Sequence, residues 1–512
     1  MTSLTPIVLG APEFPLQLSD LTRLAEPGAR LELHQSTRER TQPSRDLVER
    51  VQKEERVVYG VNTGFGRLSS VRIQPDEVEA LQRNLVRSHA AGVGDPLPQS
   101  TVRVLMALRI NSLLGGFSGV TQGLLESFCA LYNSGIVPFV PSRGSVGASG
   151  DLAPLSHVAL CLMGEGEAYW RGELIDAGEA LRKAGLKPYS FQAKEALACI
   201  NGTQLMTAVG GLALARAQWL VKAADIIAAM TVEALLGTNS AFHEAISRVR
   251  PHPGQIASAA NLRACMQDSA LVASHKGCPK VQDPYSMRCT PQVHGASREG
   301  LSFCSGLIER EINSVTDNPL VFPEEELILS GGNFHGAPVA LALDSAALSL
   351  QYLGTISERR CDRLLNPDTS ELPPFLTPHQ GLHSGLMLVQ YVAAALASEN
   401  KVFCHPASAD TIPTSAGHED HVSMGPAAAY KLEKLIDNVE QILACEWLCA
   451  TQALDFRRPL TFGPATEVAY AELRRVVPTW KDDHPPYPEL KKARQGLQAM
   501  VAAVEQKIGP LQ

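Results

Sequence analysis

The sequence predicts a mainly α fold in which a loop-rich N-terminal region precedes a bundle of long helices. Residues 204–236 are apolar on most sides, with a narrow polar stripe at helical spacing, which indicates a helix buried nearly all round. Residues 337–360 and 384–403 repeat this pattern, whereas the first 200 residues hold glycine-rich turn signals. We therefore expect two regions, residues 1–200 and residues 201–512. The polar stripe of the first helix consists of Gln218, Lys222, Asp225 and Glu233.

Further along the chain, residues 482–486 predict a loop before a final helix, because this run contains two prolines. Helices this long and apolar favour a bundle that also buries surface between subunits. One large monomeric helical core is the alternative.

Composition excludes several classes of protein. The 512 residues are 45% apolar, enough for a large core, and 45 Lys and Arg against 53 acids leave a net charge of -8. Nucleic-acid binding, which favours clustered basic residues, is not indicated. The first 30 residues lack the basic start and apolar run of a signal peptide. No stretch of 18 residues is both uncharged and strongly apolar, so we expect no membrane span.

The 11 cysteines are scattered and odd in number, which indicates reduced, mostly buried thiols in a cytoplasmic protein. Cys445 and Cys449 are spaced to share a helix face, but no ligand cluster adjoins them, so no metal site is expected there.

The most informative segment is 144–157 (GSVGASGDLAPLSH). It is neither a phosphate-binding loop, which needs spaced glycines after a strand, nor a hydrolase elbow, which needs glycine where Asp151 stands. An ordinary flexible loop remains one interpretation.

The other interpretation is a self-cyclising tripeptide, Ala148-Ser149-Gly150. The Gly150 amide nitrogen would attack the Ala148 carbonyl carbon, and loss of water would close a five-membered ring. Loss of the Ser149 hydroxyl would then leave an exocyclic methylene. Glycine supplies an unhindered nucleophile that can enter a strained turn, and alanine is small enough for the backbone to fold on itself. The product is an electron-poor alkene.

This segment resembles the signature of the histidine and aromatic amino-acid ammonia-lyase family, whose prosthetic group is 4-methylideneimidazole-5-one (MIO). The resemblance extends in order from about Lys53 to Phe462. It implies a fold of the ammonia-lyase/fumarase-like type and a carbon-nitrogen lyase whose MIO forms autocatalytically, with no metal or external cofactor. The other matching segments are 59–66 (YGVNTGFG, the family's mobile inner loop), 201–204 (NGTQ), 282–288 (QDPYSMR), 314–319 (SVTDNP), 331–336 (GGNFHG) and 419–424 (EDHVSM).

The resemblance also implies catalytic roles. The substrate amine would add to the methylidene carbon and become a better leaving group, and Tyr59 would remove the β-proton. Tyrosine has a pKa of about 10 in water, so a nearby arginine or positive helix end would have to help it ionise. Tyr285 matches a residue close to the ring.

Four further residues match substrate-binding positions of the family. Arg288 would hold the substrate carboxylate through two parallel hydrogen bonds. Asn201 matches a residue near the substrate amine and carboxylate, Gln282 one that supports this network, and Phe334 one that lines the pocket near the ring.

The substrate expected from this resemblance is L-histidine, with trans-urocanate and ammonia as products. Ser88-His89 resembles the pair found in the histidine branch of the family. Enzymes for phenylalanine or tyrosine usually carry Phe-Leu or His-Leu at this position. Glu419 stands where aromatic lyases tend to carry glutamine. A carboxylate pairs with an imidazole N–H but would be a buried, unpaired charge against a phenyl ring. His89 and Glu419 are therefore the predicted specificity residues.

The chain departs from the family pattern at Gly417-His418, usually Asn-Gln, and at Ala337, where the histidine branch often has an acid. These departures keep open a tyrosine ammonia-lyase, a MIO-dependent 2,3-aminomutase that returns the amine to the β-carbon, and a non-catalytic scaffold. His418, Glu419 and His421 lack His-Glu-x-x-His spacing, so no metal is expected there. The resemblance implies a homotetramer with active sites assembled from several subunits.

Overall fold

The computed structural model describes residues 5–54, 56–64 and 71–512. It confirms the predicted mainly α fold, because helices make up most of the described chain and every strand is short. The chain divides into two compact units. Unit 1 comprises Met1–Ala215, Ser305–Asp344 and Pro406–Tyr430, and unit 2 comprises Arg216–Cys304, Ser345–His405 and Lys431–Gln512.

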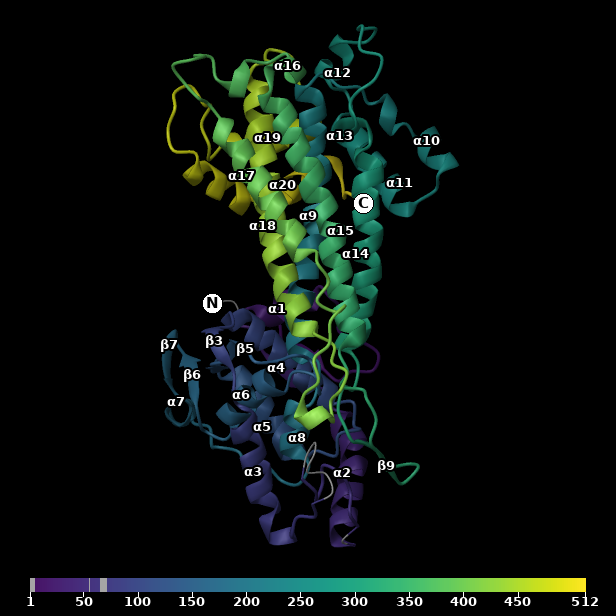
Figure 1. The fold of residues 1–512 in the computed structure, drawn as a ribbon, viewed down its shortest axis with the longest axis vertical. Coiled ribbons are helices and arrows are strands. Elements are labelled where there is room, and N and C mark those ends of the chain that lie inside the picture. Colours follow the sequence, from purple (N-terminus) through teal and green to yellow (C-terminus); the bar gives the residue numbers. More distant parts are fainter. Residues whose placement is uncertain (1–4, 55, 65–70) are drawn as a thin grey trace. The chain divides into compact units, whose positions relative to one another are not determined.

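The predicted long helices are present. α9 spans Gln204–Ala234, α15 spans Ala337–Leu365, α17 spans Met387–Phe403, and the last helix, α20, spans Tyr487–Ile508 (Figure 1). Two further long helices are α14 (Thr290–Ile312) and α18 (Gly425–Asp455). Cys445 and Cys449 both lie buried on α18.

The described residues of unit 1 form shorter helices and four small sheets. β1 pairs with β2 in parallel, whereas β3–β5, β4–β6–β7 and β8–β9 are antiparallel. Thr121 caps α5, and Asp176 caps α7, each by accepting a backbone N–H of the first turn. The elements are β1 (Ile7–Leu9), α1 (Asp20–Ala25), β2 (Leu31–Leu33), α2 (Thr37–Lys53), η2 (Pro75–Glu77), α3 (Val78–His89), β3 (Val93–Pro96), α4 (Gln99–Leu113), α5 (Gln122–Asn133), β4 (Val137–Pro138), β5 (Pro141–Arg143), α6 (Leu152–Leu162), β6 (Glu167–Trp170), β7 (Glu173–Asp176), α7 (Ala177–Lys183), α8 (Glu195–Ile200), β8 (Leu320–Phe322), β9 (Leu327–Leu329) and η5 (Ser415–Gly417).

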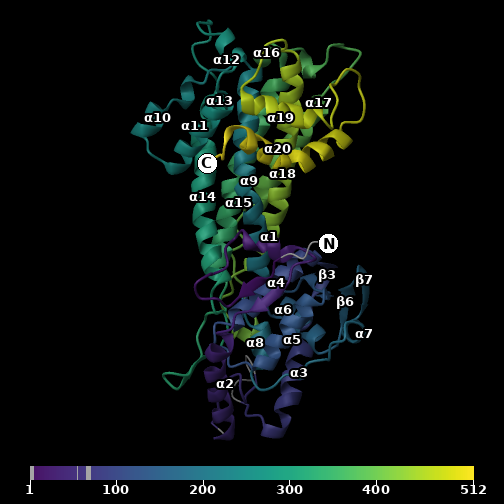
Figure 2. The same cartoon turned by 180° about the vertical axis from the view of Figure 1, so that it is seen from behind.

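Unit 2 is built around α9, α14, α15 and α18, which run beside one another in both views (Figures 1 and 2). On α14, a Cβ added to Gly300 would lie 2.1 Å from the Ser349 hydroxyl of α15, so only glycine allows this approach. The remaining elements of the unit are η3 (Ser240–Phe242), α10 (Glu244–Val249), α11 (Pro253–Cys265), α12 (Ala270–Ser274), α13 (Tyr285–Arg288), α16 (Pro367–Ser370), η4 (Pro374–Leu376) and α19 (Pro464–Arg474).

Buried polar pairs tie the helices of unit 2 together. Glu446 on α18 accepts hydrogen bonds from Thr231 on α9 at 2.7 Å and from Arg360 on α15 at 2.5 and 2.9 Å. The Arg360 and Glu446 side chains are both fully buried, so each serves as the other's counterion in the interior.

Among the described residues, α15 alone is long and apolar enough to cross a membrane by length and composition. Within the protein, 67% of its most apolar window is buried, a degree of burial that is also found in core helices of globular proteins.

Candidate active site

Three helices of unit 1 bring predicted site residues together at their ends. α3, α6 and α8 pack on one another. α3 ends at His89, α6 begins just after the Ala148-Ser149-Gly150 tripeptide, and α8 ends just before Asn201. Segments that are far apart in the sequence therefore meet because three short helices share one contact region.

The residues at two of these helix ends, the start of α6 and the end of α8, border a cavity of about 570 Å³ in unit 1. Tyr59, Ala148, Ser149, Asn201, Phe334 and Glu419, all predicted site residues, line it. The rest of its lining is Asn318, Ser330, Gly331, Gly332, His335, His418, Asp420 and His421. The predicted inner loop continues to Phe65 and Gly66, which lie outside the described residues.

The tripeptide sits on a backbone that has no room for larger residues. Gly150 has φ +71°, and a Cβ there would lie 2.2 Å from the carbonyl oxygen of Gly202. The Asp151 N–H donates to that same carbonyl at 2.6 Å. Glycine is the residue that tolerates both the positive φ and the close approach. The local structure thus meets the predicted requirement for glycine as the third residue of the tripeptide.

Asp151, directly after the tripeptide, is fully buried and holds the turn. Its carboxylate accepts the Ser145 hydroxyl at 3.2 Å and the Met206 N–H at 3.0 Å. Burial raises the pKa of Asp151 to about 7, against the lowering effect of these hydrogen bonds. The carboxyl therefore links the turn around the tripeptide to the first turn of α9.

Glu419 is the acidic group that the structure places against the tripeptide. Its Oε1 accepts a hydrogen bond from the Ser149 hydroxyl at 2.8 Å, and its Oε2 accepts one from the Thr414 hydroxyl at 2.7 Å. Each carboxylate oxygen thus has a hydroxyl donor, which fixes the plane of the carboxylate in the cavity.

His89 is half-buried and is not among the residues that line the cavity. Its Nδ1 lies 2.9 Å from the Leu85 carbonyl, so Nδ1 carries the hydrogen and Nε2 is left as an acceptor in the neutral ring. Burial lowers the pKa of His89, and the Glu419 carboxylate opposes that effect electrostatically. The structure thus places Glu419 in the cavity lining and His89 outside it.

Asn201 presents an acceptor that no described residue satisfies. Its Nδ2 donates to the Asn318 carbonyl at 3.0 Å, while its Oδ1 is buried without a hydrogen-bond partner among the described residues. A buried polar atom without a partner is costly. Because Asn201 is one of the residues that line the cavity, its Oδ1 is the candidate acceptor for a ligand donor such as an ammonium group.

Buried charged side chains hold Asn201 in place, directly and through Asn318. Arg109 donates to its backbone carbonyl at 2.9 Å. Lys194 and Asp317 form a fully buried ion pair at 2.7 Å, and Asp317 also accepts the Asn318 N–H at 2.7 Å. This pair fixes Asn318, which in turn receives the Asn201 amide.

The cavity lining is rich in imidazoles. The ring centroids of His335 and His421 lie 5.7 Å apart, and His335 Nε2 lies 3.1 Å from the His421 carbonyl. His418, one of the departures from the family pattern, is exposed and lines the cavity. Phe334 is half-buried beside them and supplies the apolar part of the wall.

The remaining predicted residues lie in unit 2 and do not line this cavity. Gln282 is exposed, Tyr285 is 71% exposed, and the Arg288 guanidinium carbon lies 4.7 Å from the Tyr285 ring centroid. Their loop is anchored by Asp283, which accepts the Thr238 N–H at 2.7 Å. This segment thus exposes the Tyr285 ring on the surface of its unit, with the half-buried Arg288 beside it.

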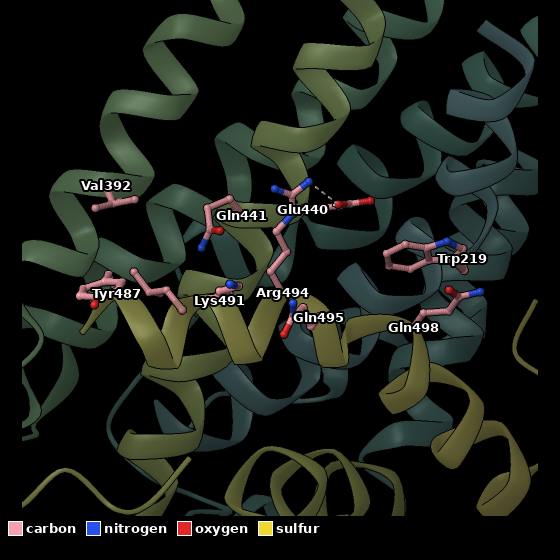
Figure 3. Close-up of a pocket in the computed structure, with 10 residues that line it drawn as sticks. Trp219, Val392, Glu440, Gln441, Tyr487, Lys491, Arg494, Gln495 and Gln498 are labelled. Atoms are coloured by element: carbon pink, nitrogen blue, oxygen red, sulfur yellow. Dashed lines mark hydrogen bonds and ion pairs between the residues drawn. The ribbon is translucent and has the colours of Figure 1, made fainter. Parts of the chain in front are cut away.

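Unit 2 contains a cavity of about 620 Å³ that holds none of the predicted residues (Figure 3). Two of its charged groups pair with each other, since Arg494 lies 2.9 Å from Glu440, and Arg494 also pairs with the nearby Asp437 at 2.7 Å. The cavity in unit 1, with an acceptor lacking a partner and a carboxylate held by hydroxyls, is therefore the candidate active site.

Thr414, which donates to Glu419, is a site residue that sequence analysis missed. It lies five positions before Glu419 in a stretch without a repeating pattern, and no sequence signal marks it. The motif at 314–319 contains Asn318 and Asp317, but only the structure shows that they support Asn201. Within the described ranges, no group of three or more His, Cys, Asp or Glu side chains is arranged to hold a metal ion.

Comparison of the chain with known proteins identifies its family. The model of the family described as aromatic amino acid lyase matches residues 16–475. A histidine ammonia-lyase from Anaeromyxobacter sp. (strain K) is 54% identical over 91% of this chain and 94% of its own length.

Solved structures agree with that match. A histidine ammonia-lyase from Trypanosoma cruzi is 42% identical with a TM-score of 0.91, covering 98% of this chain and 96% of its own. A tyrosine aminomutase from Streptomyces globisporus is 36% identical with a TM-score of 0.93, covering 99% and 100%. The chain belongs to the aromatic amino acid lyase family.

Proposed function

We propose that this protein is a histidine ammonia-lyase that deaminates L-histidine to trans-urocanate and ammonia without oxidation. The observation that carries the proposal is the Glu419 carboxylate, held in the cavity against Ser149 at 2.8 Å. Curated relatives about half identical over most of the chain bear the name histidine ammonia-lyase, which supports the same substrate.

The electrophile is MIO, formed from Ala148, Ser149 and Gly150 with loss of two waters. The structure fits this group on two points. The Gly150 backbone excludes any side chain, and the Ser149 hydroxyl that must leave points into the cavity toward Glu419. When present, MIO supplies an electron-poor alkene, an electrophile that no side chain provides.

Residues of unit 1 bind the substrate and remove its proton. Glu419 accepts a hydrogen bond from the substrate imidazole, which a phenyl ring cannot provide. The free Oδ1 of Asn201 accepts from the substrate ammonium. Tyr59, half-buried in the same lining, takes the β-proton, and Phe334, also in the lining, packs against the substrate. His89 and Glu419 together select histidine.

Tyr285, Arg288 and Gln282 act on a substrate bound by another copy of the chain, in a homotetramer. Tyr285 is exposed on the surface of unit 2 with the half-buried Arg288 beside it, where a partner's cavity can reach them. Unit 2 also exposes large apolar side chains that suit burial between subunits: Phe303, Leu348, Tyr352, Leu388, Tyr391 and Val402. Arg288 then binds the substrate carboxylate in a bidentate manner.

We place the enzyme in the cytoplasm. Eight of the 11 cysteines are buried, in keeping with reduced thiols in a reducing compartment. Its substrate is a small molecule, and we propose no nucleic-acid or membrane partner.

Product identification after separate incubation with L-histidine, L-tyrosine and L-phenylalanine tests this function. We expect trans-urocanate and ammonia from histidine and far slower reaction of the other two. A β-amino acid would reveal a 2,3-aminomutase, and preferential release of ammonia from tyrosine would reveal a tyrosine ammonia-lyase. The first result would overturn the proposed reaction, and the second would overturn the proposed substrate.

A further inference from the structure

Thr414 and Glu419 face each other across a tight turn. The Thr414 N–H donates to the Glu419 carbonyl at 2.9 Å, and the Glu419 N–H donates back to the Thr414 carbonyl at 3.3 Å. Between them, Ser415 and Ala416 have φ values of +51° and +53°. Two consecutive non-glycine residues in the left-handed region cost energy, so the surrounding contacts must impose this turn.

The same pair is joined through its side chains. The Thr414 hydroxyl donates to Glu419 Oε2 at 2.7 Å, while the Ser149 hydroxyl donates to Oε1 at 2.8 Å. Glutamate otherwise rotates about three side-chain bonds, and ordering such a side chain on binding weakens affinity. A hydroxyl fixed by the backbone bridge removes that freedom before any ligand arrives.

Only one of these two donors survives ring formation. When the tripeptide condenses, Ser149 loses its hydroxyl, and Oε1 loses that hydrogen bond while still facing the cavity. Thr414 keeps its hydroxyl and continues to hold Oε2.

We propose that Thr414 is a positioning residue that fixes Glu419 so that Oε1 receives the imidazole N–H of the substrate. This inference rests on the proposed function, because it needs Glu419 to bind that ring. It assigns to the turn at 414–419 the task of presenting a preorganised carboxylate.

The test compares Thr414→Val, which keeps the shape and removes the donor, with Thr414→Ser, which keeps the donor. Calorimetry measures the affinity of each protein for 3-(imidazol-4-yl)propanoate, a ligand with the ring and carboxylate but no amine. We expect Thr414→Val to bind it on the order of 10- to 100-fold more weakly, as befits a lost hydrogen bond to a charged group. Thr414→Ser should bind within about threefold of the unmodified protein, and kcat/KM for histidine should follow the same order.

Thr411→Val is the matched control. The Thr411 hydroxyl accepts the Val422 N–H at 2.8 Å in the same loop, so its loss perturbs the loop without removing a donor from Glu419. Intact mass of each variant checks the tripeptide, and we expect every variant to be lighter than its sequence by two waters.

Unchanged ligand affinity in Thr414→Val, an equal loss in Thr411→Val, or failure of Thr414→Ser to restore binding would each overturn the role of Thr414. A Thr414→Val chain of full mass would also overturn it, by showing a role in ring formation instead. If the unmodified protein neither binds the imidazole ligand nor converts histidine, the proposed function is wrong, and the role of Thr414 that rests on it is wrong too.

Discussion

The Ser149 hydroxyl donates a 2.8 Å hydrogen bond to Glu419 Oε1 across 270 positions of sequence. The residue that must lose its hydroxyl and the residue proposed to read the substrate ring are therefore in direct contact. Replacing Glu419 with glutamine removes the charge and turns one acceptor into a donor. We expect Glu419→Gln to lower kcat/KM for histidine by roughly 10- to 100-fold or more, because a hydrogen bond to a charged acceptor is lost.

The control for Glu419→Gln is Asp420→Asn, which changes the neighbouring acid in the same cavity lining. Its effect on histidine turnover should be within about threefold, since surface charge alone contributes little. Equal loss in both variants would show that the summed negative charge of the cavity matters, and not the placement of Glu419. Steady-state kinetics with histidine provides the measurement.

Support of Asn201 by buried charge predicts a loss of stability in Asp317→Asn. This variant leaves Lys194 buried without its counterion, a change that costs about 3–5 kcal/mol in comparable sites. The exposed pair between Lys183 and Glu179 gives the control, because Glu179→Gln should cost under about 1 kcal/mol. Urea unfolding followed by circular dichroism measures both, and equal midpoints would contradict the structural role of the buried pair.

A pH dependence of stability follows from Glu233, which is fully buried on α9. Burial raises its pKa to about 7. Between its unfolded pKa near 4.5 and about 7, the folded chain keeps a proton that the unfolded chain releases, so this group makes stability fall as pH rises. We expect Glu233→Gln to gain up to about 3 kcal/mol over the unmodified protein between pH 5 and 8.

Urea unfolding of Glu233→Gln at several pH values provides the measurement. The exposed Glu173 of β7 supplies a control, and Glu173→Gln should track the unmodified protein at every pH. Parallel stability curves for Glu233→Gln and the unmodified protein would show that Glu233 stays ionised in the fold.

Assembly of each site from more than one copy predicts complementation between inactive variants. Ser149→Ala removes the ring precursor, and Arg288→Ala removes the carboxylate ligand on unit 2. Each alone should be nearly inactive, whereas subunits of the two unfolded and refolded together should regain a measurable fraction of activity. Mixed assemblies without any regained turnover would indicate that Arg288 serves its own chain or none.

Much of the helical fold could be predicted because hydrophobic periodicity is local. α9, α15 and α17 begin and end within a few residues of the predicted ranges, apart from the longer end of α15. Asp225, in the polar stripe of α9, is fully buried, in keeping with a helix buried nearly all round. It accepts hydrogen bonds from Ser258, Asn261 and Arg298 and pairs with His294. Those partners lie on other helices, and no local pattern reveals them.

In the candidate site, too, local motifs could be predicted and contacts between distant segments could not. Motifs identified Ser149, Asn201 and Glu419, which the structure brings to one cavity. The hydroxyl of Thr414 could not be predicted, because its contact depends on left-handed backbone at Ser415 and Ala416, which the sequence does not signal.

The mass of the freshly purified intact chain tests the central claim most directly. If Ala148, Ser149 and Gly150 condense, the protein will be lighter than its sequence by two water molecules, and a peptide spanning residues 144–157 will carry the whole difference. Ser149→Ala, which has no hydroxyl to eliminate, will not show the full loss. An active protein with the unaltered mass of its sequence would contradict the account.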